Sequence, residues 1–157
     1  MSFVRIYSFS YFVFRFSYVV IVFRLSSFVR SYSLKLMKTS RNFRDYKVWQ
    51  DAVAYASEVY KVSATLPFFE RKGLCDQLQR AVVSISSNIA EGSARPSDAD
   101  FAHFLDTALG SAYEVETQLL IAKNVGYIQD ELFENLRTTV INIEQQITNL
   151  ISYIRKN

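Results

Sequence analysis

The sequence contains one cysteine, Cys75, and one histidine, His103. A single cysteine excludes an intramolecular disulfide and suits a reducing cytoplasm, where we expect the protein to reside. The chain also lacks a CxxC pair and the GxGxxG and Walker patterns of nucleotide-binding loops. These absences remove common signatures of zinc, redox and nucleotide chemistry. Cys75 is therefore interpreted as a packing residue or an inert surface residue.

Residues 1–36 contain no acidic side chain, and the first acid of the chain is Asp45. The same segment lacks alanine, glycine, asparagine, glutamine and proline, and consists mostly of serine, phenylalanine, valine, arginine and tyrosine. Such bias indicates a low-complexity extension, disordered or not native, rather than a folding unit. We favour Met37 as the true start, with residues 1–36 as translated upstream sequence. A membrane-surface or targeting tail and a genuine extra element remain the alternatives.

No membrane span is expected in this extension, because arginines interrupt every apolar run and a span needs about 18 uncharged residues. Residues 37–157 are predicted to form one domain. The extension also dominates the charge. The whole chain carries 18 basic and 15 acidic residues, net +3, whereas 13 basic and 15 acidic residues follow Met37, net −2. The basic character alone therefore does not argue for nucleic-acid binding.

Four stretches after Asp45 repeat apolar residues every three or four positions, which is typical of amphipathic helices. Helices are expected over about 45–66, 70–94, from Ser97 as N-cap to a C-terminal cap at Gly126, and from 129 or 130 to the C-terminus. Their predicted apolar faces are Trp49, Ala52, Ala56, Val59, Ser63 and Leu66, broadened by Val53 and Tyr60; Leu74, Leu78, Ala81, Val82, Ile85 and Ile89; Phe101, Leu105, Ala108, Ala112, Val115, Leu119 and Ala122; and Phe133, Leu136, Val140, Ile143, Ile147, Leu150 and Ile154.

Helices of this length, joined by short loops and without strand signals, predict an all-α fold. The expected architecture is an up-down-up-down antiparallel four-helix bundle. Small residues on facing stripes would let the helices approach closely.

Several segments carry a family resemblance. Residues 43–50, 77–95 (ending in Asn-Ile-Ala-Glu-Gly-Ser-Ala-Arg), 101–105, 108–119 and 125–128 resemble the proteins encoded in intervening sequences of bacterial 23S rRNA genes. That family is similar to accessory proteins of diversity-generating retroelements, which form ring-shaped pentamers and bind nucleic acid and a reverse transcriptase. The resemblance implies a homo-oligomer, a pentamer, and contact with RNA. Residues 1–36 depart from the family pattern.

The predicted topology gathers basic residues at one bundle end, formed by the first helix start, the second loop and the last helix end. Such a cluster can neutralise RNA phosphates, and an oligomer would multiply weak contacts. The alternative is a solvated end whose cations complement the last helix dipole. The candidate nucleic-acid contacts are Arg41, Arg44, Lys47, Arg80, Arg95, Arg155 and Lys156, with Lys38, Arg71 and Lys72 as additional basic residues.

Specific polar residues occupy the second and third helices. A di-metal carboxylate bundle needs two Glu-x-x-His motifs, and this chain has one histidine, so no metal or other cofactor is expected. No nucleophile–base pair is evident either. His103 is interpreted as a surface or interface residue, and Trp49 as a core or staple aromatic. A structural polar network is predicted from Ser84, Asn88, Glu91, Glu116 and Gln118.

These observations favour a non-enzymatic, homo-oligomeric bundle that contacts RNA or a ribonucleoprotein weakly and electrostatically. The alternative is a protein-interaction or structural module without nucleic-acid affinity. Neither a membrane nor a small-molecule substrate is an expected partner.

Overall fold

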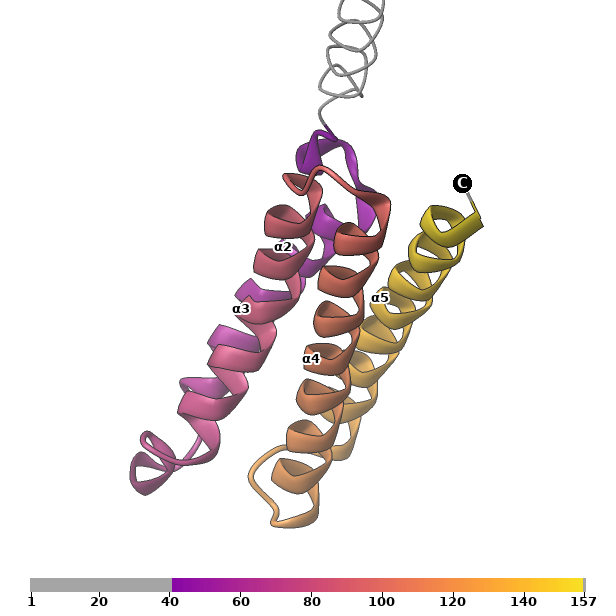
Figure 1. Cartoon of the computed structure of the whole chain (residues 1–157). Coiled ribbons are helices and arrows are strands. Elements are labelled where there is room, and N and C mark those ends of the chain that lie inside the picture. The colour runs from indigo at the N-terminus through magenta and orange to yellow at the C-terminus, as the bar shows by residue number, and fades with distance from the viewer. Residues whose placement is uncertain (1–40, 157) are drawn as a thin grey trace, which may run out of the picture. The chain divides into compact units, whose positions relative to one another are not determined.

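The computed structural model describes residues 41–156 (Figure 1). The predictions for residues 1–36, for a start at Met37 and for Lys38 lie outside the described residues. The described part contains two 3-10 turns and four long helices, and no strand. The elements are η1 (Phe43–Asp45), α2 (Lys47–Ser63), η2 (Phe68–Glu70), α3 (Leu74–Ser93), α4 (Asp98–Asn124) and α5 (Asp130–Lys156). The predicted all-helical class is thus confirmed for this part of the chain.

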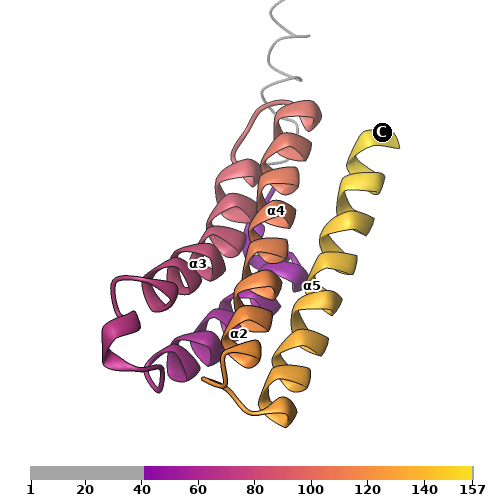
Figure 2. The same ribbon diagram turned by 90° about the horizontal axis from the view of Figure 1, so that it is seen from below.

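Each long helix packs against two others. Helix α2 contacts α3 and α5, α3 also contacts α4, and α4 also contacts α5. Figures 1 and 2 show consecutive helices lying side by side and joined by short turns, with the α4–α5 turn at the end opposite the C-terminus.

Both predicted caps of α4 are present. The Ser97 hydroxyl accepts a hydrogen bond from the backbone N–H of Asp100 at 3.0 Å, which satisfies a free donor of the first helical turn. At the other end Gly126 has a φ of +79°, the left-handed conformation that glycine adopts without strain. The following N–H, of Tyr127, then bonds the carbonyl of Ala122 at 2.8 Å. These caps fix the length of α4.

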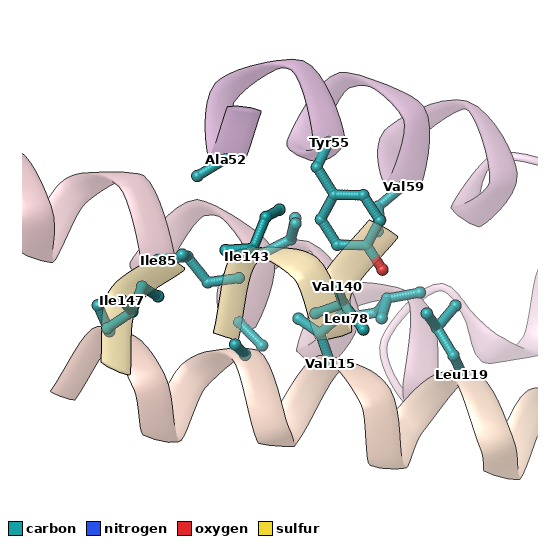
Figure 3. Packing of buried hydrophobic residues seen from close by; sticks show 14 of the residues in the cluster. Ala52, Tyr55, Val59, Leu78, Ile85, Val115, Leu119, Val140, Ile143 and Ile147 are labelled. Carbon is teal, nitrogen blue, oxygen red and sulfur yellow. The ribbon is translucent and has the colours of Figure 1, made fainter. Parts of the chain in front are cut away.

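The core lies along the inner faces of all four helices (Figure 3). The predicted faces of α4 and α5 are buried, except that Ile151 takes the buried place predicted for the half-buried Leu150. On α3, Leu78, Ile85 and Ile89 are fully enclosed. Cys75 is buried, and its thiol lies 3.4 Å from the Ser63 carbonyl oxygen, so it packs rather than facing solvent.

The predicted face of α2 was partly wrong. Val53 and Tyr60 are exposed, whereas Val48 and Tyr55 are buried. The residues 48, 52, 55 and 59 also follow a three–four spacing, and this register encloses the large Tyr55 ring between α3 and α5 (Figure 3). Burial of so much aromatic surface stabilises this rotation of the helix over the one that would bury Ala56.

Two helix boundaries also differ from the prediction. Helix α2 ends at Ser63 rather than Leu66, although Leu66 still packs into the core. Helix α3 begins at Leu74 rather than Glu70, because the Glu70 carboxylate accepts the N–H of Leu74 at 3.1 Å and so caps the helix from outside. The ten residues between them, 64–73, contain η2 and the turns on either side of it.

Candidate nucleic-acid interface

Two cations predicted to share one end of the molecule, Arg41 and Arg95, do lie together, and Arg155 binds farther along α4. The Arg41 guanidinium donates to the Arg95 carbonyl at 2.8 Å and pairs with Asp98 at the start of α4. It also lies over the Phe101 ring, 5.0 Å from the centroid. From the end of α5, Arg155 reaches Asp106 of α4 at 2.6 Å. Arg41 thus joins the segment before α2 to the α3–α4 turn, and Arg155 joins the end of α5 to α4.

Most of the charge at this end is neutralised internally. Besides Arg41 and Arg155, Lys47 pairs with Asp51 one helical turn on, and Arg95 pairs with Glu91 in the same way. The Lys47 ammonium, and next a hydrogen bond from Gln146 of α5 at 3.0 Å, hold the pKa of Asp51 below its ordinary value. Six of the predicted cations belong to this end: Arg41, Arg44, Lys47, Arg95, Arg155 and Lys156. A phosphate would have to compete with a carboxylate for four of them.

Arg44 and Lys156 are different. Both are exposed, and among the described residues no carboxylate pairs with either. The Arg44 guanidinium lies over the Phe43 ring, 4.4 Å from its centroid, and Phe43 contacts Trp49 edge-on at 4.9 Å. Trp49 thus supports the η1 turn and is half-buried. The result is an exposed arginine held on an aromatic platform, which favours a cation–π geometry.

Arg80 does not join this end. It lies thirteen positions before the end of α3, a separation of about 20 Å at 1.5 Å per residue. Its guanidinium pairs with Asp76 at 3.0 Å. His103 is exposed, with its ring edge-on to Phe104.

Two of the five predicted network residues form a polar junction between α3 and α4. The Asn88 amide donates to the Ser84 carbonyl at 2.7 Å and the Ser84 hydroxyl at 2.9 Å. Ser111 of α4 completes the junction, because its hydroxyl lies 2.9 Å from that of Ser84. The sequence prediction missed Ser111, whose only signal was a small polar residue beside the alanines of the α4 seam.

The other three residues lie elsewhere and serve separate contacts. Glu91 pairs with Arg95, and Glu116 accepts from Arg137 of α5 at 2.9 Å. The Gln118 amide donates to Glu114 at 2.9 Å, while its buried oxygen has no hydrogen-bond partner in the described part of the chain. The five residues therefore do not form one network.

Charged groups line a groove between two of the helices, and unpaired charges in a groove are candidates for catalysis or binding. A groove of about 460 Å³ between α4 and α5 is lined by the Glu116–Arg137 pair and by Lys123, which faces Asp130 and Glu134. Its charges are thus paired across it. Within residues 41–156 no cluster of three histidine, cysteine, aspartate or glutamate side chains could hold a metal ion. No helix in that range is long and apolar enough to cross a membrane.

Comparison with known proteins agrees with this architecture. The family described as 23S rRNA-intervening sequence protein matches residues 44–149. A crystal structure of a protein of unknown function from the S23 ribosomal protein family of Bacteroides thetaiotaomicron is similar, with a TM-score of 0.62 and 27% sequence identity. The match covers 66% of this chain and 97% of that one. No curated protein matches the chain.

Proposed function

Because the chain belongs to the 23S rRNA-intervening sequence protein family, we propose that it is a non-enzymatic, homo-oligomeric, cytoplasmic protein that binds RNA through phosphate groups. The order of helix contacts and the short turns support an up-down-up-down antiparallel four-helix bundle as the scaffold. The paired charges of the α4–α5 groove support a role without catalysis.

The observation that carries RNA binding is the exposed Arg44 on its Phe43–Trp49 platform. Among residues 41–156 its guanidinium pairs with no carboxylate, so a phosphate would not have to displace one of these carboxylates to bind it. Lys156 offers a second such cation at the end of α5. Two free cations per subunit give weak binding, and an oligomer would present several copies to one RNA. The contact is therefore expected to be tight only in the assembled state and to carry little sequence preference.

Filter binding of the full chain to a structured 23S rRNA fragment, measured from about 50 to 300 mM salt, tests this proposal. The variant R44Q/K156Q should weaken binding and make the slope of log affinity against log salt shallower by about 1–2 per subunit engaged. R80Q is the matched control, because it removes an exposed arginine that already pairs with Asp76. Equal binding by R44Q/K156Q and wild type would show that the site is elsewhere. No wild-type binding at low salt would favour a pure protein-interaction module.

A separate surface supports the oligomer. The outer side of α4 exposes Tyr113, Leu120 and Ile121, at 51%, 45% and 47% of their surface. Gly110 lies on the same side, and a Cβ built there would have no atom of the described residues within 4 Å. A mid-helix glycine costs about 1 kcal/mol relative to alanine. A glycine beside exposed apolar side chains is the composition that admits a second helix closely, which fits a second copy of this chain.

Native mass spectrometry tests the assembly, for which the family resemblance implies a pentamer. Replacing Leu120 and Ile121 with glutamate should dissociate it while the helical circular dichroism remains. Val83 of α3, which is 40% exposed, provides the control substitution V83E. An unchanged mass for L120E/I121E would assign the interface to another face.

A further inference from the structure

The turn between α2 and α3 exposes two aromatic rings. Phe68 and Phe69 of η2 are 77% and 74% exposed, more than any other large apolar side chain of residues 41–156. The third residue of the turn, Glu70, is turned inward and half-buried. This arrangement inverts the usual preference, in which the carboxylate faces water and the rings are covered.

Hydrogen bonds hold Glu70 in this position. One carboxylate oxygen accepts the N–H of Leu74 at 3.1 Å, and the other accepts the Tyr127 hydroxyl at 3.1 Å. The Tyr127 ring in turn lies edge-on to Phe69, with centroids 6.2 Å apart. Successive residues of a 3-10 turn lie about 120° apart around its axis, so the two rings point in different directions. The rings are thus positioned by the fold and do not cover each other.

Cations accompany the rings. The Arg71 guanidinium lies over the Phe68 ring, 4.8 Å from the centroid, and the Phe68 side chain still remains largely exposed. Lys72 follows and is exposed. Within residues 41–156 neither cation pairs with a carboxylate, because the neighbouring Glu70 is bound to Tyr127 and to the α3 backbone. Open aromatic faces beside unneutralised cations are the two elements of a single-stranded nucleic-acid platform.

We propose that the η2 end of the molecule binds single-stranded RNA, with unpaired bases stacked on Phe68 and Phe69 and phosphates contacted by Arg71 and Lys72. The inference rests on the proposed RNA-binding function for its class of ligand. It places this contact at the opposite end from Arg44 and assigns it a different chemistry. Stacking tolerates any base, so the site should not discriminate sequence.

Fluorescence anisotropy of the full chain with a labelled 12-nucleotide uridine oligomer, and with a matched RNA duplex, tests the proposal. The variant F68L/F69L keeps the apolar surface but removes the π faces. It should weaken single-strand binding about tenfold or more, since stacking contributes about 1–3 kcal/mol per base. Duplex binding by F68L/F69L should be unchanged, whereas R44Q/K156Q should lose duplex binding and keep single-strand binding. F68W/F69W restores aromatic faces and should restore the single-strand affinity.

Other outcomes overturn the proposal. Equal single-strand affinity for F68L/F69L and wild type would show that the rings do not stack on bases. In another outcome, wild type and F68L/F69L both bind vesicles of phosphatidylcholine with phosphatidylserine while neither binds the uridine oligonucleotide. That result would overturn the proposal in favour of a lipid contact at the turn.

Discussion

The two ends of this helical domain differ in how far their charges are paired and their aromatic rings are buried. At the Arg44 end, four of six cations are matched by carboxylates, and one of these four, Arg41, also lies over the Phe101 ring. At the η2 end, the one inward-facing charge is Glu70, while Phe68, Phe69, Arg71 and Lys72 are left to solvent.

The difference separates residues that maintain the fold from residues available to a ligand. Pairs such as Arg41–Asp98 join segments far apart in the chain, so their charge is already used. Side chains at the η2 turn make few contacts beyond the turn itself. A count of basic residues in the sequence would rank the Arg44 end as the better RNA site. The cations that pair with no carboxylate among residues 41–156 are instead divided evenly between the Arg44 end and the η2 end.

The largest expected effect on stability comes from adding a side-chain atom at Gly92, where α3 packs closely against α4. A Cβ added to Gly92 would lie 2.5 Å from the Cβ of Phe104 and 2.9 Å from Cδ2 of Phe101. The Cβ of Phe104 is attached directly to the α4 backbone, so relieving this contact requires the helices to shift. G92A should therefore lower the free energy of unfolding by about 3 kcal/mol, measured by urea denaturation.

Gly110 provides the control for this substitution, because a Cβ there meets no atom of the described residues within 4 Å. In the L120E/I121E background, where the proposed interface is disrupted, G110A should leave stability unchanged or raise it by up to about 1 kcal/mol through helix propensity, and G92A is compared in the same background. Destabilisation by both substitutions to the same extent would show that close helix approach at Gly92 is not the cause.

A smaller effect is expected from removing one cation at each end. Arg41 is largely buried and donates to both the Arg95 carbonyl and Asp98. R41Q should therefore cost about 1 kcal/mol, above the value of an exposed ion pair. R71Q removes an exposed arginine that pairs with no carboxylate among residues 41–156, and it should change the unfolding free energy by less than about 0.5 kcal/mol. Equal losses would contradict the division between fold-maintaining and free cations.

The smallest effects concern pH, and they have opposite signs at the two ends. The pKa of Asp51 lies below its ordinary 3.8, first because of Lys47 and then because of Gln146. Its contribution to the stability of the fold is therefore present above pH 3.8 and is lost as the pH falls through the lowered pKa. Burial, and then the bond to Glu70, raise the pKa of Tyr127 above 10.0, so its contribution is present below pH 10 and is lost as the pH rises.

Denaturation midpoints measured from pH 3 to 11 should show both slopes. D51N should flatten the acid side and Y127F should reduce the alkaline side, where Tyr55 also contributes because burial raises its pKa. An unchanged acid slope in D51N would mean that Asp51 is not stabilised by its neighbours in solution.

The sequence by itself determined the four helices, the caps at Ser97 and Gly126, and the seams of α4 and α5. Each of these depends on residues close together in the chain: a periodic apolar face, a hydroxyl three residues before an N–H, or a glycine after the last turn. The helical class and the family follow from the same local patterns.

Only the tertiary structure decided which face of α2 is buried, which cations are free and which polar residues meet. Two apolar registers of α2 are compatible with its sequence, and the space between α3 and α5 selects the one that holds Tyr55. Ser84 meets Ser111 across a helix pair, and Glu70 meets Tyr127 across 57 positions of the chain. Such partners are brought together by packing, because a charged or polar side chain is satisfied by whichever group the fold places beside it.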